Sequence, residues 1–238
     1  MQQYFIDNVA QCEGIVLFNE EQAHHIRHVM RMREQEIVKI VDASGNPFLV
    51  HIHYEANQVC GIVMQALEKK PKPLHITLVQ GLIKKDKWDF LIQKCTELGV
   101  DVIVPMASSR TIVKLEKDDT KKIARYNKIA RSAAEQCKRD TLVQVLPIIR
   151  FQEIKAYKSE LNILAYENED HSFKQVLRSH ADVQSITFVV GSEGGFSREE
   201  AELLKEDGFI SISLGNHILR AETAAMDAIA IAQYELTM

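Results

Sequence analysis

The sequence lacks any apolar run near the roughly 20 residues that a helix needs to cross a bilayer, so we expect no membrane span. Its opening stretch, MQQYFIDNVAQCEG, lacks the basic and then apolar regions of a secretory signal peptide. The 4 cysteines of the 238-residue chain, at positions 12, 60, 95 and 137, form no CxxC pair. This spacing argues against a zinc site or a disulfide framework, and it favours reduced thiols in a cytoplasmic protein.

The chain also has little excess of one sign of charge over the other, since the net charge is only −4. That total gives no reason to expect a polyanionic partner, but the charge is unevenly distributed. Residues 73–150 carry 15 Lys and Arg against 9 Asp and Glu, whereas residues 151–238 carry 7 against 15. The positive middle third suits contacts with nucleic-acid phosphates, although a solvated helix face explains the same charge.

Residues 1–72 predict a small β-rich domain, a barrel with one helix over residues 20–32. In the helix, Ala23, Ile26, Val29 and Met30 share one apolar stripe. The runs EIVKIVDA, FLVHIHYE and VCGIVMQAL alternate in hydrophobicity and are bounded by turn residues, as strands are. His24 and His28 lie one helical turn apart without a third ligand nearby, which favours a polar helix face over a metal site.

Residues 73–238 predict an α/β domain after a proline-containing linker at residues 69–73. The strand-like run LHITLVQGL is followed by a helix that Asp86 caps and Gly99 ends, and then by the strand-like run VDVIVPM. Such strand–helix–strand units form parallel sheets. A long basic helix is expected over residues 120–138, and a last helix from about Ala221 is alanine-rich and apolar nearly all round, so we expect it to be buried.

Two strand-like runs near the C-terminus each end in a loop that contains glycine and opens into a helix. These loops are GSEGGF at residues 191–196 and LGNHIL at residues 214–219. Glycines and charges at the ends of strands indicate a binding site, and strand-to-helix turns of this kind often hold nucleotides.

GSEGGF is neither a GxGxxG motif nor a P-loop, and the Glu193 carboxylate would repel a phosphate. A phosphate-free nucleoside such as S-adenosylmethionine therefore fits the loop better than a nucleotide does. A purely structural turn, with Ser197 and Glu200 as a capping box, is the alternative.

Several longer motifs resemble those of the bacterial RsmE family of the SPOUT superfamily. GSEGGFSREE resembles GPEGGFS-x-x-E, and LGNHILRAETA resembles LG-x-R-ILR-x-ETA. KWDFLIQKCTELGV is similar to K-x-x-x-x-IQK-x-TELGV, and AAEQCKRD is similar to A-EQS-x-R. The resemblance covers essentially the whole chain. Members of this family methylate N3 of one uridine in 16S ribosomal RNA.

The resemblance implies a PUA-like RNA-binding barrel at residues 1–72 and a SPOUT methyltransferase domain with a deep trefoil knot at residues 73–238. It also implies a cytoplasmic homodimer that uses S-adenosylmethionine and acts on 16S ribosomal RNA or the small ribosomal subunit. We expect Arg220 to stabilise negative charge on the uracil, and Glu222 to orient Arg220 or to cap the last helix. The expected cofactor-binding residues are Tyr166, Gly191, Glu193, Gly194, Gly195, Leu214, Gly215, Ile218 and Leu219. The expected RNA-binding residues are Arg27, Arg31, Arg110 and Arg139.

Four positions depart from the family pattern. Gln35 stands where the family has glycine, Cys137 where it has serine, Ser192 where it has proline and His217 where it has arginine. Two alternatives therefore stay open. One is a SPOUT methyltransferase with another RNA target, and the other is a non-catalytic RNA-binding protein of ribosome assembly.

Overall fold

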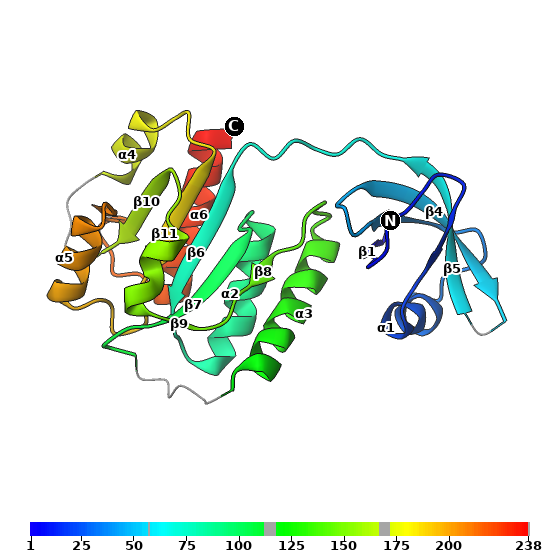
Figure 1. Ribbon diagram of the computed structural model, residues 1–238, viewed down its shortest axis with the longest axis horizontal. Coiled ribbons are helices and arrows are strands. Elements are labelled where there is room, and N and C mark those ends of the chain that lie inside the picture. The colour runs from blue at the N-terminus through cyan, green and yellow to red at the C-terminus, as the bar shows by residue number, and fades with distance from the viewer. Residues whose placement is uncertain (57, 112–117, 167–171, 238) are drawn as a thin grey trace. The chain divides into compact units, whose positions relative to one another are not determined.

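The computed structural model describes residues 1–56, 58–111, 118–166 and 172–237. Its contacts divide the chain into two compact units (Figure 1). The first comprises residues 1–71 and 134–142, and the second comprises residues 72–133 and 143–238. Residues 134–142 were expected in the second domain, whereas their contacts group them with the first unit. In the described part of the chain, no helix combines the length and apolar character needed to cross a membrane.

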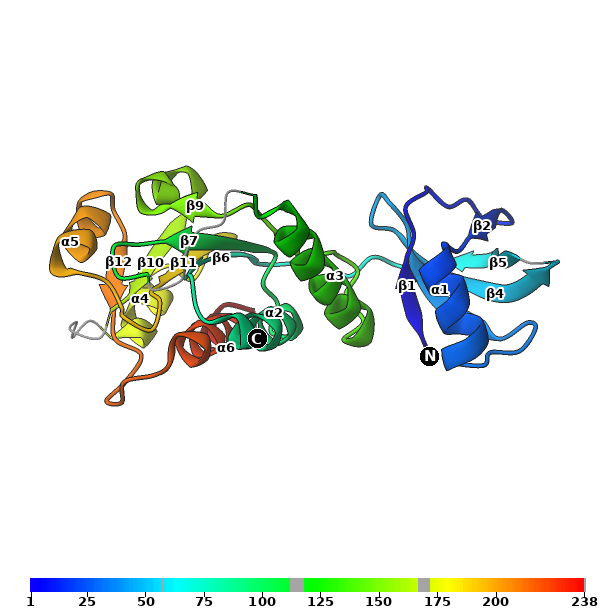
Figure 2. The ribbon, with the colours of Figure 1, turned by 90° about the horizontal axis from the view of Figure 1, so that it is seen from below.

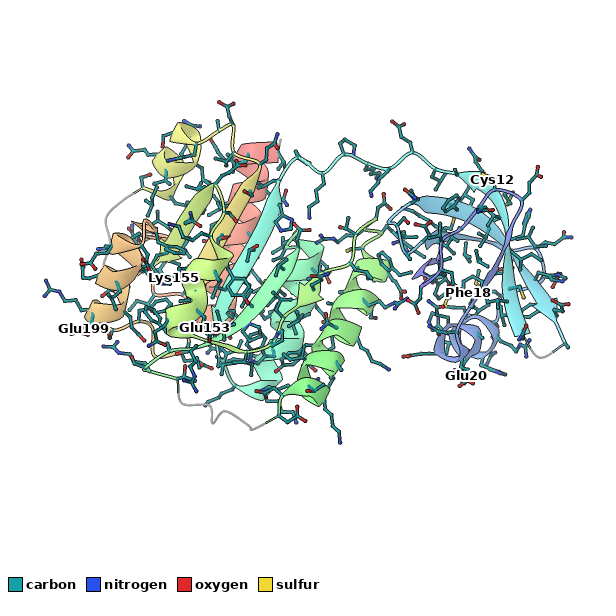
Figure 3. All side chains as sticks on the ribbon, in the orientation of Figure 1. Cys12, Phe18, Glu20, Glu153, Lys155 and Glu199 are labelled. Atoms are coloured by element: carbon teal, nitrogen blue, oxygen red, sulfur yellow. The ribbon has the colours of Figure 1, made fainter. Side chains whose placement is uncertain are left out.

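The first unit is built on a five-stranded sheet in the order β1-β3-β4-β5-β2. Strand β1 is parallel to β3, and the other neighbours are antiparallel. The predicted strands alternate as expected, with Val38, Ile40, Val50 and Ile52 completely buried on one face of the sheet. Phe18 also lies in this core, whereas Cys12 is exposed (Figure 3). The strands are β1 (Gln3–Phe5), β2 (Ile15–Leu17), β3 (Ile37–Val41), β4 (Pro47–Glu55) and β5 (Gln58–Ala66).

The helix of the first unit differs from the expected regular helix over residues 20–32. It consists of α1 (Glu20–His24) and a π-helical turn, η1 (His25–Val29). The wider turn, in which the Met30 N–H donates to the His25 carbonyl, rotates the later side chains away from the core. Ile26 is therefore fully buried, but the stripe was wrong for Val29 and Met30, which are 59% and 38% exposed.

The second unit contains a seven-stranded sheet in the order β12-β10-β11-β6-β7-β8, with β9 also paired to β7. Every strand pair in it is parallel, as the strand–helix–strand pattern predicted. Parallel strands leave their carboxyl ends at one edge of the sheet, where ligand sites of α/β proteins form. The strands are β6 (His75–Gly81), β7 (Val102–Ala107), β8 (Gln144–Val145), β9 (Ile149–Arg150), β10 (Leu161–Ala165), β11 (Ser185–Val190) and β12 (Ile210–Ile212).

Helices cover both faces of this sheet, and Figure 2 shows α2 and α6 together on one of them. Trp88, Tyr126 and Ile229 belong to the core on that face, and Ile154 and Leu204 belong to the core on the other. The sheet strands are therefore buried on both sides, which explains their nearly continuous apolar runs. The helices are α2 (Lys85–Glu97), α3 (Thr120–Gln136), η2 (Phe151–Tyr157, a 3-10 helix), α4 (Phe173–Ser179), α5 (Arg198–Glu206) and α6 (Ala221–Thr237).

The start of α2 differs from the prediction. Lys84, and not Asp86, occupies the N-cap position, and no side chain of its own caps the helix. The Glu193 carboxylate instead accepts a hydrogen bond from the Lys84 N–H at 3.3 Å. The cap thus comes from a residue 109 positions later in the chain, which no local pattern could indicate.

Candidate active site

A cavity of about 490 Å³ lies in the second unit, a volume within the usual range for small-molecule sites. It is lined by Tyr166, which directly follows β10, and by the loops that follow β11 and β12. All nine residues expected to bind the cofactor line this cavity, and so does Arg220: Tyr166, Gly191, Glu193, Gly194, Gly195, Leu214, Gly215, Ile218 and Leu219. The carboxyl ends of three neighbouring strands thus bring together residues from positions 166 to 220.

The loop at residues 191–196, called the glycine loop below, is a tight turn. The Gly195 N–H donates to the Ser192 carbonyl at 2.9 Å, and Gly195 has a φ of 64°, which favours glycine. Ser192 is buried here, with its hydroxyl 3.5 Å from the Arg110 carbonyl oxygen. The serine that replaces the family's proline is therefore compatible with the turn.

The glycine loop rests on the end of β6. The fully buried Gln80 amide donates from Nε2 to the Gly191 carbonyl at 3.1 Å and to the Gly81 carbonyl at 3.2 Å. A Cβ atom on Gly81 would lie 2.3 Å from the Ser192 backbone nitrogen. Only a residue without a side chain at position 81 lets the loop approach so closely.

The other side of the glycine loop contacts α5 and the segment after β7. Ser197 and Glu200 form the expected capping box at the start of α5. The Glu200 carboxylate also accepts the Ser109 N–H at 2.8 Å, and Arg110 donates from Nη1 to the Gly194 carbonyl at 3.2 Å. Arg110, expected to contact RNA, therefore lies against the rim of the cavity.

The loop after β12 supplies the more exposed wall. Gly215 has a φ of 123°, and its N–H donates to the Ser213 hydroxyl oxygen at 3.3 Å. Ile218 is 88% exposed, although it is apolar and lines the cavity. Arg220 is also exposed, and its carbonyl accepts the Ala224 N–H at 2.8 Å, so it directly precedes the first turn of α6. Its guanidinium is therefore available to a ligand.

Glu222 lies at the start of the last helix and is paired with Lys87. It is buried in the first turn of α6, and its carboxylate lies 3.2 Å from Lys87 Nζ. Among the described residues, no hydrogen bond or ion pair joins Glu222 to Arg220. Lys87 Nζ also lies 3.2 Å from the Glu193 carboxylate, so one ammonium contacts both acids.

This ion cluster favours the charged forms of Glu193 and Lys87. Burial raises the pKa of Glu193, but hydrogen bonds from its own backbone and from Lys84, together with Lys87, outweigh burial and lower it overall. Burial likewise lowers the pKa of Lys87, but its bonds and attraction to Glu193 and Glu222 raise it overall. Both groups are ionised near neutral pH.

The remaining arginines expected to bind RNA lie in the first unit. Arg27 donates to the Gln58 carbonyl at 3.4 Å, and its guanidinium carbon lies 5.1 Å from the centre of the Tyr54 ring. Arg31 is exposed and follows the π-helical turn. Arg139 is half-buried, and burial lowers the pKa of its guanidinium. Its surroundings are thus less accessible to a phosphate than those of Arg27 and Arg31.

Sequence reasoning missed three residues of this site: Gln80, Gly81 and Lys87. Gln80 and Gly81 end a buried strand, where a polar side chain followed by glycine is a usable signal. Lys87 begins the KWDFLIQK motif, but the motif alone gave no reason to place the lysine beside Glu193. In the described part of the chain, no group of three His, Cys, Asp or Glu residues could hold a metal ion.

Comparison with known proteins identifies relatives along nearly the whole chain. Residues 70–233 match an RNA methyltransferase domain, and residues 18–56 match an RNA methyltransferase PUA domain. The chain is 32% identical to ribosomal RNA small subunit methyltransferase E of Bacillus subtilis, over 99% of this chain and 97% of that protein. It is 31% identical to the protein of the same name from Rickettsia conorii, over 95% and 92%.

A solved structure also matches nearly the whole of this chain. The crystal structure of ribosomal RNA small subunit methyltransferase E from Neisseria gonorrhoeae, bound to S-adenosyl methionine, superposes with a TM-score of 0.90 at 30% identity. The match covers 98% of this chain and 97% of that one. With family models matched in both units, and relatives aligned over 98% or more of the chain, the chain belongs to the ribosomal RNA small subunit methyltransferase E family of RNA methyltransferases.

Proposed function

We propose that this chain transfers the methyl group of S-adenosylmethionine to N3 of one uridine in 16S ribosomal RNA. The observation that carries the proposal is the cavity at the ends of β10, β11 and β12, because it gathers all nine residues expected to bind the cofactor. The relative from Neisseria gonorrhoeae, which binds S-adenosyl methionine, supports it.

The chemistry of the cavity fits the cofactor. The glycine loop lines the cavity with backbone atoms, which lets adenine and ribose approach closely, and Glu193 adds negative charge that complements a sulfonium and opposes a phosphate. The cavity of about 490 Å³ holds a ligand of this size. When bound, S-adenosylmethionine supplies an electrophilic methyl group. We assign Tyr166, the glycine loop and residues 214–219 to holding it.

Arg220 is the residue to which we assign catalysis. N3 of uracil carries an imide proton, and its loss places negative charge on the neighbouring oxygens. The exposed guanidinium of Arg220, at the cavity wall, stabilises that charge and orients the base. We assign Glu222 a supporting role, because it lies in the first turn of α6 and contacts Lys87.

We assign residues 1–72 to a PUA-like RNA-binding domain and residues 73–238 to a SPOUT methyltransferase domain. Arg27 and Arg31 of the first domain would contact phosphates, and Arg110 would do so at the rim of the cavity. Arg139 would contribute through its place in the AAEQCKRD segment. Each such contact adds affinity without reading the base sequence.

The finer structural proposal is a cytoplasmic homodimer whose methyltransferase domain contains a trefoil knot. The dimer is supported by α6, an apolar helix whose Tyr234 is 68% exposed, whereas the knot and the cytoplasmic location are what the resemblance implies. Size-exclusion chromatography with light scattering should give twice the chain mass of 27.1 kDa. A species of single chain mass at micromolar concentration would contradict the dimer.

The test of the activity is methyl transfer in vitro. Purified protein, S-adenosylmethionine labelled in its methyl group and small ribosomal subunits that lack the modification should give labelled N3-methyluridine after digestion. Label in another nucleoside would favour a different RNA target. Binding of the subunits without any transfer or cofactor binding would favour a non-catalytic assembly role.

A further inference from the structure

Lys87 connects three parts of the chain beside the cavity. It lies in the first turn of α2, and its Nζ is 3.2 Å from a carboxylate oxygen of Glu193 and 3.2 Å from one of Glu222. Glu193 belongs to the glycine loop, and Glu222 belongs to the first turn of α6. The same oxygen of Glu193 accepts the Lys84 N–H at 3.3 Å. One ammonium therefore holds together the start of α2, the glycine loop and the start of α6.

Each of these contacts borders the cavity. Lys87 and Glu193 line it, and Glu222 directly follows Ala221, which also lines it. The side chains of Lys87 and Glu222 are 21% and 11% exposed, so water screens their attraction only partly. With Lys87 absent, two carboxylates that share one partner would face each other without a counter-charge, and the glycine loop would lose one of its two bonds to α2.

We infer that Lys87 is a positioning residue for the methyl donor, which acts by holding Glu193 and Glu222 so that the glycine loop and the start of α6 form one wall. The inference rests on the proposed function, since it takes the cavity as the cofactor site. Lys87 itself stays protonated at neutral pH because of its two acidic partners, so it is not the base that removes the imide proton.

Calorimetric titration of S-adenosylmethionine into the full-length protein tests the inference. Lys87→Met should weaken binding at least tenfold, because it removes the charge and keeps most of the side-chain volume. Lys87→Arg should bind within about threefold of the wild type, since guanidinium also bridges two carboxylates. Lys94→Met is the matched control: Lys94 lies on the same helix and is paired with Glu97 at 2.9 Å, but does not line the cavity. It should bind as the wild type does.

Kinetics and a double-mutant cycle separate positioning from a general loss of structure. Lys87→Met should raise KM for S-adenosylmethionine while kcat at saturation changes less than threefold, whereas a smaller folded fraction would lower kcat and leave KM unchanged. In a Glu193→Gln background, Lys87→Met should cost much less affinity than it does in the wild type. Fully additive losses would overturn the inference. If Lys87→Met does not fold, Lys87→Gln replaces it with the same expectations.

The two hypotheses fail in different ways. A wild-type protein that does not bind S-adenosylmethionine contradicts the proposed function. A wild-type protein that binds it, while Lys87→Met binds equally tightly, overturns only the role of Lys87.

Discussion

Replacing Gly81 by alanine should push the glycine loop away from the end of β6 and so weaken binding at the proposed cofactor site. The added Cβ would lie 2.3 Å from the Ser192 nitrogen and 2.6 Å from the Gly191 carbonyl carbon. Both are backbone atoms of the glycine loop, so no side-chain rotation can relieve the contact. The loop must retreat by roughly 1 Å to reach an ordinary separation of about 3.5 Å.

The magnitude follows from the cost of such overpacking, which is typically about 1–3 kcal/mol. In the free protein the loop can escape by moving into the cavity that it lines. A bound cofactor would push it back, so the strain should appear as lost affinity. At about 1.4 kcal/mol per tenfold change, the dissociation constant for S-adenosylmethionine should rise by about 5- to 150-fold.

Calorimetric titration measures this constant, and thermal unfolding measures the accompanying change in stability. Gly61→Ala is the matched control, because its Cβ would meet side-chain atoms of Val16 at 2.8 Å and Val50 at 2.9 Å in the first unit. That variant should lose stability but bind S-adenosylmethionine normally. Unchanged affinity in Gly81→Ala would refute the reasoning, as would an equal loss in both variants.

Three further predictions concern stability and pH. Gln35→Gly should raise the free energy of unfolding by about 0.5–1 kcal/mol in urea titrations, because the exposed Gln35 has a φ of 66° at the position where the family has glycine. Ile26→Ala should lower it by about 2–5 kcal/mol in the same assay, because Ile26 is fully buried. Glu193 should stabilise the fold above its ordinary pKa of 4.5 and lose that contribution as the pH falls through its lowered value, so Glu193→Gln should flatten the acid limb of the melting-temperature profile.

Each of these predictions has an outcome that contradicts it. A less stable Gln35→Gly would mean that the side chain compensates for its backbone conformation. A loss below 1 kcal/mol in Ile26→Ala would show that the π-helical turn relaxes to fill the space that the isoleucine side chain vacates. An acid limb that Glu193→Gln leaves unaltered would show that Glu193 has the same pKa in the folded and unfolded states.

Much of the fold could be predicted because local signals agreed with the tertiary structure. The α5 capping box at Ser197 and Glu200 and the start of α6 at Ala221 lie where the sequence placed them. Hydrophobic periodicity also identified α3 and the parallel strands. The glycine loops were recognisable because they combine glycine with charge at the ends of buried strands.

The errors arose where distant residues decide the local structure. Nothing near Lys84 indicates that Glu193 would cap α2, and nothing in residues 20–32 marks the π-helical turn that exposes Val29. Lys87 was missed for the same reason, since its partner Glu193 is 106 positions away. The pairing of Glu222 with Lys87 likewise depends on the packing of α6 beside α2. Sequence patterns thus predict helices and strands better than they predict which charged side chains will form ion pairs.

Mass-spectrometric mapping of 16S ribosomal RNA from a deletion strain tests most directly whether this chain methylates N3 of one uridine in that RNA. One N3-methyluridine should be absent. It should return with the wild-type protein and stay absent with Arg220→Ala, if that variant folds normally. An unchanged set of N3-methyluridines in the deletion strain would contradict the account.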